Sequence, residues 1–135
     1  EVNVIILAAG QGTRMNSSIS KVLHEVGNKT LIQHVIDAAM PLASSINVII
    51  GHNSESVKKS IQNNLVNWVL QKNQLGTGHA VMQAIPSIKK DSMCLILYGD
   101  VPLIQTQTLI NLLEKANKTG FSLLTVIQND PSGYG

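Results

Sequence analysis

The chain has 135 residues, enough for one compact domain with its own core. Hydrophobic residues make up 44% and charged residues 13%, which argues against disorder, and a net charge of +2 is too small to indicate binding to nucleic acid or to a membrane surface. No apolar run approaches the roughly 20 residues that span a bilayer, and the N-terminus lacks a secretory pattern, so we expect a cytoplasmic protein.

Strand-like and helix-like segments alternate along the chain. Apolar runs predict strands at residues 2–7, 47–50, 67–70, 93–98 and 122–127. Helices are predicted at 31–39 after the cap Thr30, from the cap Ser54 to about residue 63, at 77–85, and from the cap Thr106 to residue 118. In the third helix, Ile85 is expected to face inward with Ala80, Val81 and Ala84. This order predicts an α/β fold, a mostly parallel Rossmann-like sheet with helices on both faces.

The single cysteine, Cys94, lies inside the apolar run of residues 93–97. One cysteine excludes an intramolecular disulfide, and the apolar surroundings predict a small buried core residue and not a reactive thiol.

Three polar segments directly follow predicted strands. They are the loop from Leu7 to Met15, the segment from Gln71 to Ala80, and the turn Tyr98-Gly99-Asp100. Ligands bind outside the carboxyl ends of the strands in open parallel sheets, so we expect these segments to converge at one edge. The small residues of the first loop allow close approach of backbone N–H groups, and the Arg14 guanidinium suits phosphate oxygens. The pattern favours a nucleotide triphosphate as ligand.

Two common phosphate motifs do not fit this first loop. It lacks the Gly-Lys-Ser/Thr ending of a P-loop. In a dinucleotide fingerprint the third glycine would fall at Met15, and Gly51-His52 stands where the ribose-binding acid should be. A nicotinamide or flavin enzyme is therefore disfavoured.

The first loop together with Lys21 resembles the signature of the sugar-phosphate nucleotidyltransferases. The run Gln-Leu-Gly-Thr-Gly-His-Ala at 74–80 narrows the resemblance to the N-acetylglucosamine-1-phosphate uridyltransferase domain, usually the N-terminal half of a bifunctional bacterial enzyme. Residues 98–103 and 130–135 are similar to it as well. The resemblance runs from the first strand to the last residue, so residues 1–135 are expected to be the nucleotide-binding part of that domain, with no second domain in this chain.

The resemblance implies that UTP and N-acetylglucosamine 1-phosphate react to give UDP-N-acetylglucosamine and pyrophosphate with Mg²⁺. Catalytic roles would fall to Arg14 and Lys21, which would hold the triphosphate, and to Asp100, which would bind the metal. Uracil and ribose would be read by Leu7, Ala8, Ala9, Gly10, Gly12, Gln71, Gly76 and Thr77, whereas Tyr98, Gly99 and Gly135 would line the nucleotide and sugar side. Gln71 suits the uracil edge because an amide both donates and accepts.

The resemblance has two departures. Ser20 stands where the family commonly has proline, and the family domain continues beyond residue 135 with a sugar-binding Glu and Asn and a second metal ligand. The chain by itself is therefore expected to bind UTP weakly and to turn over poorly, and homotrimer formation is implied only for the acetyltransferase half, whose hexapeptide repeats do not occur here.

Two alternatives stay open. One is another sugar-phosphate or cytidylyl nucleotidyltransferase, and the other is a non-catalytic nucleotide-binding regulatory module. Of the four histidines, His24, His34, His52 and His79, none has metal-ligand spacing, and only His79 lies close to the predicted nucleotide loop.

Overall fold

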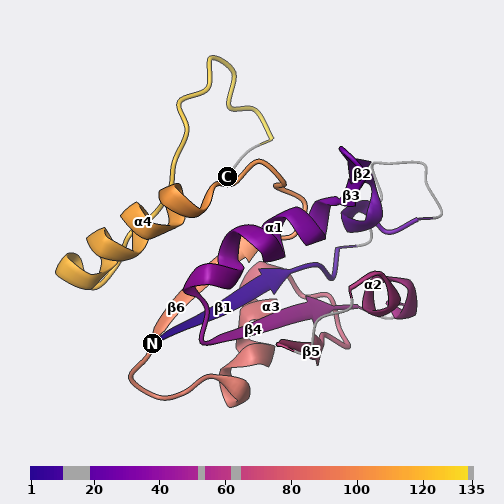
Figure 1. The fold of residues 1–135 in the computed structure, drawn as a ribbon, viewed down its shortest axis with the longest axis horizontal. Helices are drawn as coiled ribbons and strands as arrows, with labels where there is room; N and C mark the ends of the chain where they lie inside the picture. The colour runs from indigo at the N-terminus through magenta and orange to yellow at the C-terminus, as the bar shows by residue number, and fades with distance from the viewer. Residues whose placement is uncertain (11–18, 52–53, 62–64, 134–135) are drawn as a thin grey trace.

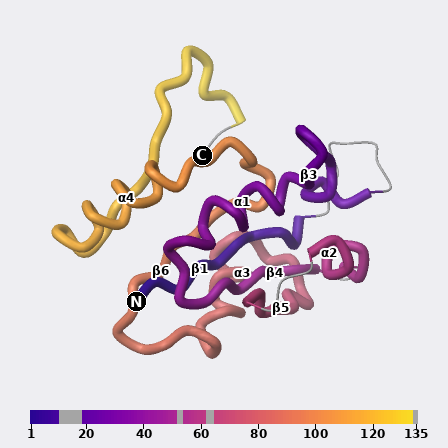
Figure 2. Tube along the Cα trace, viewed as in Figure 1, coloured from indigo at the N-terminus to yellow at the C-terminus, as the bar shows by residue number. Residues whose placement is uncertain are grey.

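The fold is built around a four-stranded parallel sheet. The computed structural model describes residues 1–10, 19–51, 54–61 and 65–133. Its strands are β1 (Val2–Leu7), β4 (Ser45–Ile50), β5 (Val66–Leu70) and β6 (Met93–Tyr98), in the order β5-β4-β1-β6 (Figures 1 and 2). All three pairings are parallel, so the four carboxyl ends meet at one edge. This arrangement confirms the predicted α/β fold class.

In the described residues, four α-helices connect or flank these strands. They are α1 (Leu31–Ala39), α2 (Glu55–Ser60), α3 (Thr77–Ala84) and α4 (Thr106–Thr119). Short 3-10 turns add η1 (Lys21–Leu23), η2 (Met40–Leu42) and η3 (Ile85–Ser87), and a two-stranded antiparallel hairpin joins β2 (Glu25–Val26) to β3 (Lys29–Thr30). The Thr30 side chain accepts from the Gln33 N–H and caps α1 as predicted. None of the helices in the described part of the chain has the length and apolar character that crossing a bilayer requires.

Side-chain alternation along the strands determines which helix covers which face. Val4 and Ile6 of β1 belong to the core that α1, α2 and α4 cover, whereas Ile5 between them packs on the α3 side with Ala80 and Ala84. In Figure 1, α1 lies in front of the sheet and α3 behind it. Because β1 is covered on both faces, its run of apolar residues contains no exposed position from residue 3 to residue 6.

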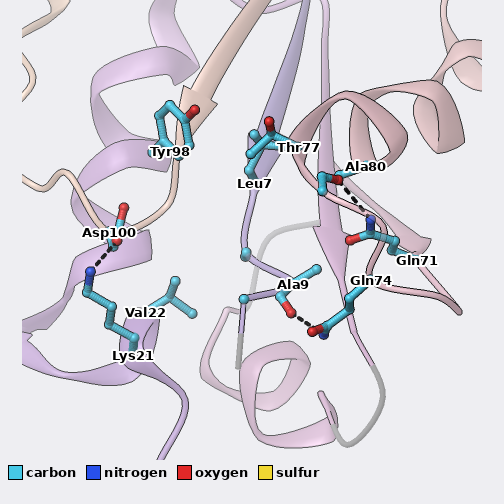
Figure 3. Close-up of a pocket in the computed structure, with 13 residues that line it drawn as sticks. Leu7, Ala9, Lys21, Val22, Gln71, Gln74, Thr77, Ala80, Tyr98 and Asp100 are labelled. Carbon is cyan, nitrogen blue, oxygen red and sulfur yellow. Dashed lines mark hydrogen bonds and ion pairs between the residues drawn. The ribbon is translucent and has the colours of Figure 1, made fainter. Parts of the chain in front are cut away.

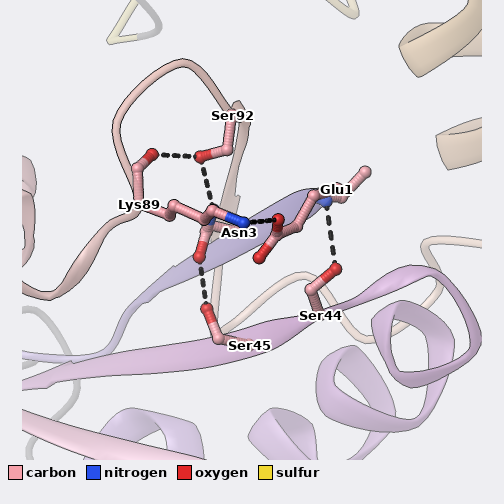
Figure 4. Close-up of polar contacts among 7 residues, drawn as sticks. Glu1, Asn3, Ser44, Ser45, Lys89 and Ser92 are labelled. Carbon is pink, nitrogen blue, oxygen red and sulfur yellow. Dashed lines mark hydrogen bonds and ion pairs between the residues drawn. The ribbon is translucent and has the colours of Figure 1, made fainter.

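The amino edge of the sheet is closed by a small polar network (Figure 4). Asn3 is buried in β1, donates from Nδ2 to the Ser92 Oγ at 2.5 Å and accepts at Oδ1 from the Ser45 Oγ at 2.5 Å. A buried amide with both ends bonded carries little desolvation penalty. The network joins β1 to the start of β4 and to the residue before β6.

The predicted last strand is wrong. Residues 122–127 form no strand, and the side chains of Leu123, Val126 and Ile127 are 71%, 72% and 100% exposed. Figure 1 shows the segment after α4 leading away from the sheet. Its apolar alternation is typical of a strand, but a strand needs a neighbour to pair with its backbone, and none in the described structure pairs with this one.

Cys94 is exposed, so the prediction of a buried cysteine is wrong. It pairs with Asn3, and β6 is the edge strand of the sheet, with alternate residues exposed. Partial burial still raises the pKa of the thiol, which makes the reactive thiolate scarcer at neutral pH.

Three helix details also differ from the predictions. Helix α2 ends at Ser60, several residues early, and Ile85 is 57% exposed because the chain leaves α3 for the turn η3 before Pro86. Thr106 is the first residue of α4 and not its cap, since its hydroxyl donates to the Ala38 carbonyl at 2.8 Å.

Candidate functional site: a cavity at the carboxyl edge of the sheet

A cavity of about 310 Å³ lies at the carboxyl ends of β1, β5 and β6 (Figure 3). The chain leaves each of these strands through a loop of small or polar residues, so backbone groups and polar side chains reach the cavity together. The lining residues are Leu7, Ala8, Ala9, Gly10, Lys21, Val22, Gln71, Gln74, Gly76, Thr77, Ala80, Tyr98 and Asp100. The predicted convergence at one edge is therefore what the structure shows.

One side of the cavity carries an ion pair. Lys21 from η1 donates from Nζ to the Asp100 Oδ2 at 2.6 Å, and Asp100 follows the end of β6. The side chains are 44% and 29% exposed, so both can reach a ligand. Ser20, the residue before η1, stands where the family resemblance led us to expect proline, and its φ of −53° is within the range that a proline ring fixes. The backbone that presents Lys21 therefore has a proline-like form without the ring.

The other side of the cavity is neutral and rich in amides (Figure 3). Gln71 directly follows β5, is only 3% exposed, and donates from Nε2 to the Gly76 carbonyl at 3.2 Å. Gly76 has a φ of 102°, which favours glycine, and its carbonyl also accepts from Ala80 in the first turn of α3. The loop between β5 and α3 is thus closed on itself by one buried side chain.

A second glutamine ties this loop to the first one. Gln74 donates from Nε2 to the Ala9 carbonyl. Gly51 at the end of β4 leaves room for this contact, because a Cβ there would lie 2.8 Å from the Gln74 Nε2 and 3.1 Å from the Ala9 oxygen. The two loops that the sequence placed at the same edge are therefore held together directly.

Most of the predicted site residues that the structure describes line this cavity. They are Leu7, Ala8, Ala9, Gly10, Lys21, Gln71, Gly76, Thr77, Tyr98 and Asp100. Gly99 is buried beside the cavity and donates from its N–H to the Leu7 carbonyl at 2.9 Å. A Cβ at Gly99 would lie 3.1 Å from that carbonyl, so this glycine permits close packing of β6 against β1. Gly12, Arg14 and Gly135 lie outside the described residues.

Sequence reasoning missed Gln74, Val22 and Ala80 as lining residues. Gln74 stands within a segment already singled out, and its amide next to a glycine-containing turn was the available signal. Val22 and Ala80 carry no chemical signal, since they contribute shape only.

The donor set fits a hard divalent cation only in part. Among the described residues no group of three His, Cys, Asp or Glu side chains could hold a metal ion. Asp100 is a single half-buried carboxylate facing the cavity. One carboxylate is compatible with Mg²⁺, which keeps several waters and takes further oxygens from substrate phosphates.

A parallel α/β sheet with a cavity lined by the loops at its carboxyl edge is typical of ligand-binding domains. Comparison with known sequences identifies the family to which this domain belongs. Residues 4–133 match the MobA-like NTP transferase domain, and the chain belongs to this family. It is 49% identical over 135 residues to the bifunctional protein GlmU of Marinobacter nauticus, and 49% identical over 134 residues to that of Ruthia magnifica subsp. Calyptogena magnifica. These matches cover 99% of this chain and 30% of each relative, so the chain spans under a third of their length.

Solved structures share the fold at low sequence identity. Rv0371c of Mycobacterium tuberculosis H37Rv superimposes with a TM-score of 0.76 at 17% identity, over 87% of this chain and 61% of that one. The same protein is also known in complex with manganese, with a TM-score of 0.73 at 16% identity, over 87% of this chain and 60% of that one. CMP:2-keto-3-deoxy-manno-octonic acid synthetase, in complex with CTP, has a TM-score of 0.72 at 20% identity, over 89% and 48% of the two chains. At these identities the likeness establishes the fold alone.

Proposed function

We propose that the chain is the nucleotide-binding part of a uridylyltransferase that makes UDP-N-acetylglucosamine, a cell-envelope precursor, and pyrophosphate from UTP and N-acetylglucosamine 1-phosphate. The 49% identity to two GlmU proteins supports this specific reaction within the family. The observation that carries the proposal is the division of the cavity into a charged side, with Lys21 and Asp100, and a neutral side, with Gln71. A nucleoside triphosphate has the same division between phosphates and base.

The two sides give the nucleotide one orientation. The phosphates would lie at Lys21, whose ammonium neutralises their charge, and the base would lie at Gln71 and the start of α3. The first N–H groups of α3 have no partners within the helix, so they are suited to carbonyl oxygens of the base or hydroxyls of the ribose. Leu7 and Ala9 lie between the two sides, and with Ala8, which also lines the cavity, they would bring backbone close to the nucleoside.

In this proposal the sugar phosphate attacks the α-phosphorus in line, and pyrophosphate leaves. The chain contributes by positioning and by charge, because phosphoryl chemistry of this type needs no covalent intermediate with the protein. Asp100 would hold Mg²⁺, which would neutralise charge on the phosphates when bound. Lys21 would then exchange its contact with Asp100 for one with a phosphate oxygen, and Arg14 is proposed for the departing pyrophosphate.

The test is a comparison of nucleotides in the full-length protein. With N-acetylglucosamine 1-phosphate as acceptor, UTP should release pyrophosphate faster than CTP or dTTP at equal concentration. If CTP or dTTP is the better substrate, the assignment to uridylyl transfer is wrong. Nucleotide binding without pyrophosphate release, with Mg²⁺ or Mn²⁺ present, would indicate the regulatory module instead.

A further inference from the structure

On the base side of the cavity, Gln71 belongs to a hydrogen-bond chain whose other side chains have no role in the proposed function. His79, on the first turn of α3, lies outside the set of residues that line the cavity and is half-buried. Its Nδ1 lies 3.0 Å from the Gln71 Nε2, and its Nε2 lies 3.3 Å from the Gln83 Nε2. One ring therefore connects the buried amide of the cavity to a second amide one helical turn further along.

The orientation of the Gln71 amide follows from its two partners. The Gly76 carbonyl can only accept, so the Gln71 nitrogen must face it. The second hydrogen of the same nitrogen then points to the His79 Nδ1, which must be unprotonated to accept it. Both amide hydrogens are used within the protein, and Figure 3 shows the Gln71 oxygen turned towards the interior of the cavity. Gln71 therefore offers a ligand an acceptor and not a donor. By contrast, residue type alone predicts an amide that both donates to the uracil edge and accepts from it.

The tautomer of His79 is assigned from its contacts with the two glutamines. A neutral imidazole has one donor and one acceptor nitrogen, so the ring cannot accept from both glutamines. The Gln71 contact is the shorter of the two, and the Gln83 nitrogen already donates to the His79 carbonyl at 3.3 Å, so we assign the acceptor to Nδ1 and the proton to Nε2.

The acceptor that Gln71 offers, its side-chain oxygen, distinguishes uracil from cytosine. Uracil carries an N3–H donor, whereas cytosine has an unprotonated N3 acceptor at the same ring position. An amide oxygen fixed at the base pairs with the first and repels the second. The fold by itself does not determine whether uracil or cytosine binds, since a synthetase with the same fold is known with CTP.

We propose that His79 is a positioning residue, which holds the Gln71 amide with its oxygen towards the base and thereby selects uracil over cytosine. The selection rests on the proposed function, because it requires a pyrimidine at Gln71. The orientation of the amide does not, because it follows from contacts within the protein.

The experiment has two readouts on the full-length protein. The first is nitrogen-15 NMR of the histidine rings without nucleotide, in which His79 should show an unprotonated Nδ1 and a protonated Nε2. The second is the ratio of the dissociation constants for CTP and UTP. His79→Leu removes the acceptor and should lower this ratio about fivefold or more, as expected for one lost hydrogen bond. In His79→Asn the side-chain oxygen occupies the place of Nδ1 and should restore most of the ratio.

Met82→Ala, an exposed change on the same helix, is the control and should leave the ratio unchanged. A proton on Nδ1 in the NMR spectrum, or an unchanged ratio in a folded His79→Leu variant, would overturn the inference. If the wild-type protein binds CTP in preference to UTP, the proposed function fails together with the selection. If the wild-type protein prefers UTP but the ratio of the dissociation constants in the His79 variants does not change as expected, the inference fails and the proposed function stands.

Discussion

Lys21 and Asp100 are 79 positions apart in the chain, yet the Nζ of one lies 2.6 Å from the Oδ2 of the other. The pair joins η1 to the turn after β6 at the cavity beyond the end of β1 (Figure 3). Both groups are partly exposed, so the pair by itself contributes little to stability. Its position at the cavity agrees with the proposed role of the two charges in holding a nucleotide and a metal ion.

Replacement of Lys21 should therefore affect the reaction more than the fold. We expect Lys21→Met to lower the rate of pyrophosphate release about a hundredfold, the usual effect of removing one donor from developing negative charge. Lys29→Met is a matched control, because Lys29 forms an ion pair of 2.6 Å with Asp37 away from the cavity. Equal losses in both variants would show that Lys21 has no special role.

Asp100→Asn tests the metal assignment. The amide keeps the size of the side chain but loses the charge that a hard cation prefers. We expect the enhancement of UTP binding by Mg²⁺ to fall at least tenfold, measured by titration calorimetry with and without the metal. An unchanged dependence on Mg²⁺ would reject Asp100 as a ligand.

Gly51→Ala should disturb the contact between the two loops. The added Cβ would displace the Gln74 side chain, which is flexible, and press on the Ala9 carbonyl, which is backbone. We expect a loss of about 1–2 kcal/mol in the free energy of unfolding and weaker nucleotide binding. Gly78→Ala is the control, since a Cβ there meets nothing within 4 Å and lies in a helix, where alanine is favoured over glycine. A destabilised Gly78→Ala with an unaffected Gly51→Ala would contradict this account.

Two buried asparagines in neighbouring strands should respond to the same substitution with opposite sign. Asn47 is fully buried, donates to the Val4 carbonyl at 3.4 Å, and has no partner for its Oδ1 in the described structure. Asn47→Val should raise the free energy of unfolding by about 1 kcal/mol, because an unpaired buried oxygen is removed. Asn3→Val should lower it by about 2 kcal/mol, because it removes the acceptor of the Ser45 hydroxyl and one of the two partners of the Ser92 hydroxyl (Figure 4). Denaturant titrations that give both changes the same sign would be against this interpretation.

The lowered pKa of the Asp37 carboxyl predicts part of the loss of stability at acid pH. Burial raises the pKa of its carboxyl, but hydrogen bonds from Lys29 and Gln33 outweigh this and hold the pKa below the ordinary value of 3.8. A carboxyl with a lowered pKa in the folded state stabilises the protein above its unfolded pKa, and this stabilisation is lost as the pH falls through the folded value. The side chain is 40% exposed, so the contribution is about 0.5 kcal/mol.

Asp37→Asn should accordingly lose less stability than the wild type between pH 6 and pH 3, measured by urea titration at both values. Glu114→Gln, an exposed carboxyl on α4, is the control for the loss of one negative charge. If the free energy of unfolding of Asp37→Asn falls between pH 6 and pH 3 as much as that of the wild type, Asp37 does not contribute to the acid sensitivity.

The strands that the sequence predicted correctly are those that have pairing partners in the described structure. The pairing partners of β1 are β4 and β6, so its apolar run indeed forms a central strand, buried on both faces. The same type of run at residues 122–127 finds no pairing partner in the described structure and forms no strand. Cys94 was misplaced for a related reason, because an apolar run does not reveal whether its strand is central or at an edge.

The sequence could predict which segments form the candidate site, but not which of their atoms contact one another. Gln71 and Asp100 were chosen by residue type and by position after predicted strands, and Lys21 was chosen by the resemblance to the family signature. All three line one cavity. The ion pair between Lys21 and Asp100 and the fixed orientation of Gln71 could not be predicted, since both depend on distances between atoms.

The sequence alone determined the alternation of the four sheet strands with helices and the edge at which the polar loops meet, because side-chain periodicity and parallel connections follow from local residue patterns. Only the tertiary structure decided which charges pair, which way the Gln71 amide faces and which apolar runs become strands. Each of these depends on a hydrogen-bonding or ionic partner supplied by another part of the chain, and the energy of such contacts is set by ångström distances that a linear pattern does not contain.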